Sequence, residues 1–176
     1  MTRLFIVVMV ACLIAACNRK HVEAPIAAAP TVAAVADTPA VNTMPLLATD
    51  TLLYYSRGAC FGMCPIFELT VMKDGRGIYV GKNHVDRIGG FYANIDNADV
   101  QHVMKKAAEI GYFQMNAVYD NDRVHDLPNI ITGIAHDGKL HRVLNRYKGP
   151  TSLQRIYAEL DTLIERQQWQ PVGANK

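Results

Sequence analysis

The sequence lacks three features that would each point to a function. Its 18 basic and 16 acidic residues leave too little excess positive charge for a protein that binds nucleic acid. No serine or threonine stands in a signature context for a catalytic nucleophile, so the sequence predicts no enzyme. Its longest apolar run, Leu4 to Ile14, is shorter than the roughly 20 residues that cross a bilayer. Nucleic-acid binding and a membrane span are therefore excluded.

The first 17 residues have the layout of a secretory signal. A short basic start precedes the apolar run, which ends in the small residues Ala15 and Ala16. Ile14-Ala15-Ala16-Cys17 resembles the bacterial lipobox. This resemblance implies that residues 1–16 are removed, that Cys17 is linked to diacylglycerol and that its new amine is acylated. The alternative is a plain cleaved signal in which Cys17 has no role.

Lipidation would anchor the protein to a membrane through Cys17. In lipoprotein sorting as generally described, an Asp after the lipidated Cys retains a protein in the inner membrane, and this position is Asn18 here. We therefore expect the outer membrane, on its periplasmic face. Residues 17–49 are rich in Ala and contain four prolines, which predicts a flexible tether. A single domain is expected at 50–170, followed by a tail at 171–176.

Alternating apolar residues from Glu68 to Gly81 predict a hairpin. Its two runs meet at Asp74-Gly75, a dipeptide suited to the positive φ angles of a two-residue turn. Tyr79 is then expected on the wetter face of the sheet. Five apolar residues share the core face in this register: Phe67, Leu69, Val71, Ile78 and Val80.

A second hairpin is predicted at 130–146 around Asp137-Gly138, with His136 opposite Lys139 and His141 diagonally across from His136. Apolar residues at helical spacing predict two helices, one from Asp96 to Gly111 and one from Gly149-Pro150 to before Trp169. With a strand at 51–57, the element order is β-β-β-α-β-β-α. We therefore predict an α+β domain of two layers, an antiparallel sheet of about five strands with both helices on one face.

Cys60-Phe61-Gly62-Met63-Cys64-Pro65 lies between the first two predicted strands. Cys12 leaves with the signal and Cys17 is lipidated, so Cys60 and Cys64 are the remaining pair and are expected to form a disulfide in an oxidising compartment. Thioredoxin-type redox chemistry favours two residues between the cysteines and a following helix, whereas this motif has three and a following strand.

A Cu(I) carrier is the main alternative for these cysteines. Cys-x-x-x-Cys-Pro is similar to the motif of the copper chaperones that serve cytochrome oxidase, which add a distant histidine. His136 or His141 is the candidate third ligand, since two thiolates and an imidazole suit Cu(I). These chaperones carry their motif before a helix in a thioredoxin-like fold, which the predicted order of elements does not match.

The domain also resembles an uncharacterised family of bacterial lipoproteins and secreted proteins classed as a domain of unknown function. The resemblance rests on Arg57-x-x-Cys60-Phe61-Gly62-x-Cys64-Pro65, Asp74-Gly75, Tyr79-x-Gly81, Gly111-Tyr112-Phe113, Tyr119 and Asp126-Leu127-Pro128. It covers residues 50 to about 168 and implies no activity.

These observations favour a non-enzymatic binding module without a cofactor, held at the membrane, that binds a periplasmic protein or envelope component. Exposed aromatic and Met side chains are favoured at interfaces. The expected contact residues are Phe61, Met63, Tyr54 and Tyr79. The alternatives are the thiol-redox or Cu(I) carrier and an inhibitor or immunity-type lipoprotein that blocks a toxin or hydrolase.

Overall fold

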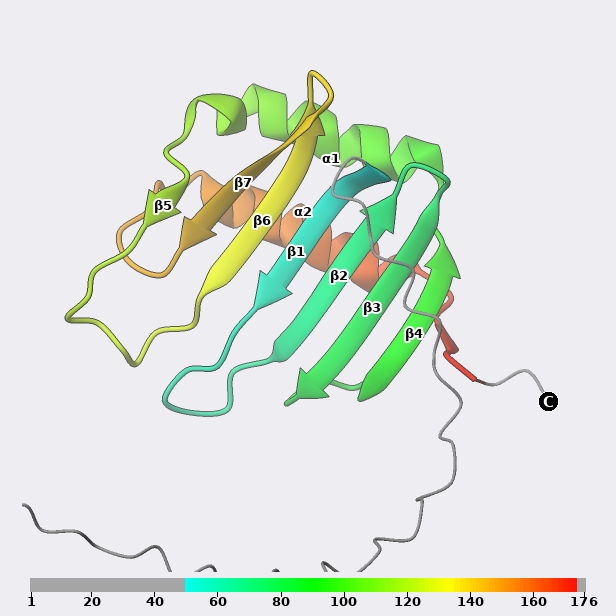
Figure 1. The fold of residues 1–176 in the computed structure, drawn as a ribbon, viewed down its shortest axis with the longest axis horizontal. Coiled ribbons are helices and arrows are strands. Elements are labelled where there is room, and N and C mark those ends of the chain that lie inside the picture. The colour runs from blue at the N-terminus through cyan, green and yellow to red at the C-terminus, as the bar shows by residue number, and fades with distance from the viewer. Residues whose placement is uncertain (1–49, 174–176) are drawn as a thin grey trace, which may run out of the picture. The chain divides into compact units, whose positions relative to one another are not determined.

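The computed structural model describes residues 50–173, so the signal, the tether with Cys17, and residues 174–176 lie outside the described part. Figure 1 shows one sheet with two long helices behind it. In chain order the elements are β1 Thr51–Arg57, β2 Ile66–Met72, β3 Arg76–Asn83, β4 Gly89–Asn94, α1 Asn97–Glu109, the 3-10 helix η2 Tyr112–Gln114, β5 Val118–Tyr119, β6 Ile130–His136, β7 Lys139–Asn145, α2 Leu153–Arg166 and β8 Gln170–Pro171.

The sheet has eight strands in the order β5-β7-β6-β1-β2-β3-β4-β8, and β5 with β7 is its one parallel pair. The α+β class is confirmed, but the prediction of about five strands was wrong because it missed β4, β5 and β8. Gly89 and Gly90 open β4 and interrupt its alternation. The strands β5 and β8 have two residues each, too few for a periodic pattern.

The turn between β2 and β3 has three residues, Lys73 to Gly75, instead of two. Gly75 has a φ of +85° and donates its N–H to the carbonyl of Met72 at 3.0 Å. The extra turn residue shifts β3 by one position, so that Leu69 lies opposite Tyr79 rather than Val80. Because side chains alternate along a strand, Tyr79 enters the core and is only 4% exposed, against the prediction.

The second hairpin has the predicted two-residue turn. Asp137 and Gly138 have φ values of +48° and +75°, as a type I′ turn requires, and His136 pairs with Lys139.

The first helix, α1, also begins and ends as predicted. The side chain of Asp96 accepts the N–H of Ala98 at 2.9 Å, and Gly111 follows the helix with a φ of +69°.

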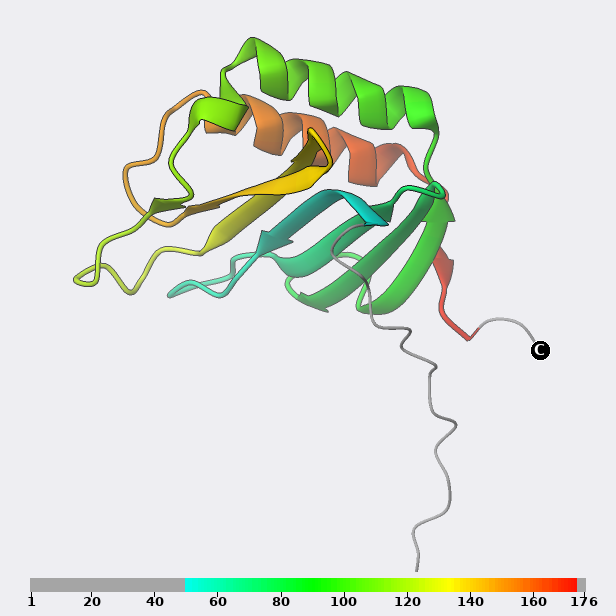
Figure 2. The ribbon, with the colours of Figure 1, turned by 45° about the horizontal axis from the view of Figure 1, so that its top comes forward.

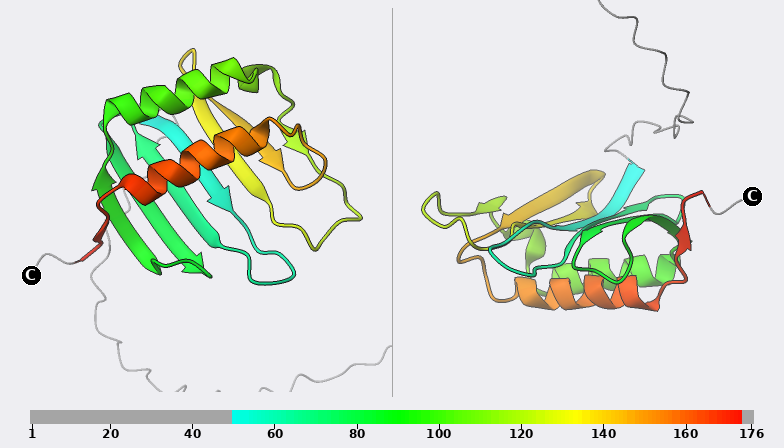
Figure 3. Two further views of the ribbon diagram at one scale, coloured as in Figure 1. Left: turned by 180° about the vertical axis from the view of Figure 1, so that it is seen from behind. Right: turned by 90° about the horizontal axis from the view of Figure 1, so that it is seen from below.

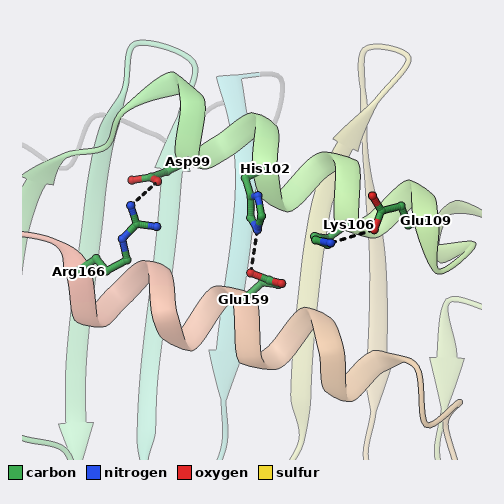
Figure 4. A network of polar contacts seen from close by, with 6 residues as sticks. All are labelled: Asp99, His102, Lys106, Glu109, Glu159 and Arg166. Atoms are coloured by element: carbon green, nitrogen blue, oxygen red, sulfur yellow. Dashed lines mark hydrogen bonds and ion pairs between the residues drawn. The ribbon is translucent and has the colours of Figure 1, made fainter.

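Both helices cover the same face of the sheet, and no helix of residues 50–173 lies on the other face (Figures 2 and 3). Apolar side chains from both layers form the core between them. Two polar contacts join α1 to α2 along their outer surfaces, an ion pair of Asp99 with Arg166 at 3.2 Å and a hydrogen bond between Nε2 of His102 and Oε2 of Glu159 at 3.0 Å (Figure 4). These exposed pairs add little stability, so the two layers are held mainly by apolar burial.

The two ends of β1 define the two ends of the domain. Asp50, just before β1, accepts the N–H of Lys73 at 2.8 Å, so the chain enters the sheet beside the β2–β3 turn. β1 then runs along the sheet, so the loop that follows it, with Cys60 and Cys64, lies at the opposite end (Figure 1). Neither helix within residues 50–173 is long and apolar enough to cross a membrane.

Candidate functional site

The connection between β1 and β2 is closed by a disulfide. Cys60 and Cys64 are bonded, with their Cα atoms 5.9 Å apart. Gly62 stands between them with a φ of +155°, which residues with a Cβ rarely adopt, and donates its N–H to the carbonyl of Cys60 at 3.0 Å. The glycine therefore permits the tight path that brings the two cysteines together.

This closed loop presents two large apolar side chains to solvent. Phe61 is 93% exposed and Met63 is 85% exposed, the highest values for large hydrophobic residues in the described part of the chain. Both were predicted to be contact residues. The other two predicted contacts lie elsewhere, because Tyr79 is buried beneath the helices and Tyr54 is half-buried on the uncovered sheet face, where the Arg142 guanidinium lies 4.6 Å from its ring centroid. The structure therefore does not bring the four residues into one surface.

Two neighbouring loops support the disulfide loop. In the 120–129 loop, the carbonyl of Asp126 accepts the N–H of Phe61 at 3.1 Å and the carbonyl of Asn129 accepts the N–H of Gly58 at 2.8 Å. In the 84–88 loop, Nδ1 of His84 lies 3.3 Å from the carbonyl oxygen of Cys64. We call the loops 58–65, 84–88 and 120–129 together the disulfide-loop end. The sequence analysis did not predict this assembly. The three loops are far apart in the chain, and only the pairing of the strands that carry them brings them to one end of the sheet.

A polar cluster ties the base of the disulfide loop to α2. Arg57, the last residue of β1, donates from Nη2 to Oδ2 of Asp161 at 2.5 Å and from Nε to the hydroxyl of Tyr55 at 2.6 Å. The Tyr55 hydroxyl in turn donates to Oδ1 of Asp161 at 3.0 Å. The signal for this cluster is weak in the sequence, since Asp161 is 104 positions from Arg57.

Burial governs the ionisation of this cluster. It raises the pKa of Tyr55, and the nearby Asp161 carboxylate adds to that rise. Burial also raises the pKa of Asp161 above its usual range, although the positive charge of Arg57 opposes the change. Tyr55 therefore stays neutral and serves as both acceptor and donor, which fits a structural brace.

The histidines proposed as copper ligands lie far from the two cysteines. Ile130 pairs with Arg57, and His136 is six residues further along β6, which places it about 20 Å away at about 3.3 Å per residue. The His136 ring stacks on Phe113 with centroids 4.1 Å apart, and the His141 ring packs against Tyr112 at 5.4 Å. The structure does not bring either histidine to Cys60 and Cys64.

The sequence comparisons place this chain in a family. Residues 51–164, well over half of the chain, match a family described as a domain of unknown function (DUF6438). The chain belongs to the DUF6438 family. The matched part of the DUF6438 domain runs from β1 into α2 and includes the disulfide loop, Arg57 and Asp161. A search of curated proteins found no match.

The aspartates of the 120–129 loop do not gather in the DUF6438 domain as cation ligands. Asp120 accepts two hydrogen bonds from Arg146, from Nε at 2.6 Å and from Nη2 at 2.5 Å. These bonds lower the pKa of Asp120. Among residues 50–173, no three His, Cys, Asp or Glu side chains are placed to hold a metal ion.

Two open hollows of about 270 Å³ each lie at the other end of the DUF6438 domain, beside the β2–β3 turn. Met72, Lys73 and Asp74 contribute to both. Phe61 and Met63 line neither hollow. The most exposed apolar groups of the domain therefore project from its surface at the end opposite to these hollows.

Proposed function

We propose that this protein is a lipoprotein of the outer membrane that faces the periplasm and acts as a non-enzymatic binding module through its disulfide-loop end. One observation carries the proposal: Phe61 and Met63 are exposed almost completely on a loop that a disulfide closes and two other loops support. Solvent exposure of two large apolar side chains on a restrained loop is unfavourable for an isolated domain, and it is typical of a surface that binds a partner.

The energetics favour binding at this loop. Burial of a Phe or Met side chain contributes about 1.5–3 kcal/mol, so both together supply a large part of the free energy of a micromolar complex. A loop that is already closed loses less conformational entropy on binding than a flexible one. The disulfide and the bonds to Asp126 and Asn129 provide this restraint.

Anchoring at Cys17 is supported by the lipobox-like residues 14–17, and Asn18 supports the outer membrane. Between Cys17 and β1 lie 33 residues, 18–50, which at about 5–6 Å times the square root of their number span about 30 Å as a flexible coil. Because the chain enters at the end of the sheet opposite to the disulfide loop, a tether at Asp50 leaves Phe61 and Met63 free to point away from the lipid.

Replacing Cys17 with alanine is expected to release the protein from the membrane. In cell fractionation, the wild-type chain should sediment with the outer membrane and incorporate labelled palmitate, and the Cys17→Ala chain should do neither, because two or more acyl chains are needed for stable anchoring. Cys12→Ala is the matched control, since Cys12 lies in the segment that is removed. A Cys17→Ala chain that still sediments with the outer membrane would contradict the anchor.

A photoreactive residue at position 61 is expected to form a covalent adduct with the binding partner. The full-length protein with p-benzoylphenylalanine in place of Phe61 should give a discrete adduct in living cells upon illumination. The same residue at Gln154, exposed on α2, is the control and should give none. Adding Met63→Ser should reduce the adduct at position 61 about tenfold, since that change removes part of the apolar contact. The absence of any adduct at position 61 would refute the proposed contact surface.

An inhibitor or immunity-type lipoprotein is a special case of this proposal, in which the partner is a toxin or a hydrolase. The Cu(I) carrier has less support because His136 and His141 lie far from the cysteine pair, and the thiol-redox carrier has less support because a strand, β2, and not a helix follows the two cysteines. Thiol trapping in cells separates the two functions: a carrier requires Cys60 and Cys64 to be reduced for part of the time, whereas the binding module keeps them oxidised.

A further inference from the structure

We propose that the disulfide-loop end inserts into an apolar cavity of a partner protein, and that the rim of this cavity carries lysine or arginine side chains. The inference rests on the proposed function and adds to it the class and the surface chemistry of the partner. Three properties of the described residues carry it: the shape and polarity of the loop, its bracing, and the charge of the two loops beside it.

The tip of the disulfide-loop end is apolar and convex. Residues 58–67 contain no charged side chain, and Phe61 and Met63 project from them. Two further exposed apolar residues stand on the neighbouring loops, Leu127 at 41% and Ile88 at 59%. A projecting apolar group loses the most water contact when it enters a concave site, so the complementary surface is a cavity rather than a flat patch.

The tip is also braced from below. The disulfide closes the loop, Asp126 accepts the N–H of Phe61, and Arg57 at its base is bonded to Asp161 on α2. A loop held in this way keeps one shape and cannot adapt to many surfaces. It therefore suits a partner with a preformed cavity, as other braced recognition loops do.

The loops beside the tip have an acidic balance. Together, 84–88 and 120–129 contain four acidic residues and two basic residues, Arg87 and Arg123, a formal balance of −2, or −1 once Asp120 is set against Arg146, whereas the whole chain has a formal net charge of +2. Asp120 is paired with Arg146, but Asp86, Asp122 and Asp126 are exposed and make no ion pair within residues 50–173. Carboxylates around an apolar tip are complementary to a basic rim.

The same charges disfavour a lipid surface as the binding partner of the disulfide-loop end. Anionic headgroups attract clusters of Lys and Arg, and they repel an apolar tip that is surrounded by carboxylates. The expected tether also enters at the opposite end of the sheet, beside Lys73. Both observations favour a protein over the membrane that holds the anchor.

The adduct formed at position 61 provides the test. Asp122→Lys and Asp126→Lys are introduced together into the full-length chain. Glu165→Lys on the exposed side of α2 serves as a control for a single charge reversal away from the disulfide-loop end. We expect a protein adduct whose yield falls about tenfold with the paired reversal, and also falls when salt is raised from about 50 to 500 mM in isolated envelopes, because rim charges act mainly on association. Glu165→Lys should leave the yield unchanged.

The outcomes separate this inference from the function on which it rests. A protein adduct whose yield is unchanged or raised by the paired reversal overturns the basic rim. An adduct with phospholipid or peptidoglycan overturns the protein partner but leaves a binding module at this surface. No adduct at position 61 overturns both. Circular dichroism of each purified variant, matched to wild type, shows that a lost adduct reflects the surface and not the fold.

Discussion

Replacing Gly81 with alanine is expected to destabilise the domain by about 3 kcal/mol and to lower its melting temperature by about 10 °C. A Cβ at this position would lie 1.7 Å from the carbonyl oxygen of Arg87 and 2.9 Å from Cγ2 of Val85. The clashing atom of Arg87 is a backbone oxygen, which cannot rotate away as a side chain can, so the clash is relieved only if the whole 84–88 loop moves. Because His84 in that loop contacts Cys64, the change should also loosen the disulfide-loop end.

Gly58→Ala is the matched control for this prediction. Its added Cβ would lie 3.5 Å from the nearest atoms of Asn129, which is ordinary contact, so we expect a change in the free energy of unfolding within about 0.5 kcal/mol. Urea denaturation of the purified full-length chains measures both. If Gly81→Ala were as stable as Gly58→Ala, the close approach of the 84–88 loop to β3 would be wrong.

Truncation of Tyr55 to alanine is expected to lower the free energy of unfolding by about 3–5 kcal/mol. Its side chain is fully buried, with its ring edge-on to Phe67 at 5.2 Å and stacked on Tyr157 at 6.2 Å between centroids. The alanine would leave a cavity between β1 and α2. It would also remove the hydroxyl that lies between Arg57 and Asp161.

Tyr55→Phe separates the two contributions. It keeps the ring and removes only the hydroxyl, and because Arg57 still pairs directly with Asp161, we expect a loss of about 1 kcal/mol. Equilibrium denaturation with unchanged m-values would allow the variants to be compared directly. Equal losses for Tyr55→Phe and Tyr55→Ala would show that hydrogen bonding, and not ring packing, dominates at this position.

The predicted helices agree with the structure because their signals are local. The N-cap at Asp96, the left-handed Gly111 and the apolar spacing of α2 all lie within a few residues of the elements that they define. The hairpin at Asp137-Gly138 was predicted for the same reason. The length of the β2–β3 turn was predicted wrongly. A three-residue turn that ends in Gly75 contains the same Asp-Gly dipeptide as a two-residue turn, so the dipeptide does not distinguish the two lengths.

The candidate site divides in a similar way. The pairing of Cys60 with Cys64 was predicted because they are the two cysteines left beyond the signal and the lipobox, and Phe61 and Met63 were chosen because aromatic and Met side chains are favoured at interfaces; the structure has the disulfide and exposes both side chains. Tyr79 was assigned to the same surface only because the register was wrong by one residue. The brace of Tyr55, Arg57 and Asp161 depends on packing α2 against β1, which no local pattern encodes.

The amino-acid sequence by itself determined the α+β class, both helices, five of the eight strands and the closed Cys60–Cys64 loop, since each depends on neighbours in the chain. The tertiary structure alone decided which side chains share a surface. Strand order brings the loops 58–65, 84–88 and 120–129 to one end and carries His136 and His141 away from the cysteines. Pairing between distant strands sets this arrangement, because register and strand order are decided by burial across the whole sheet.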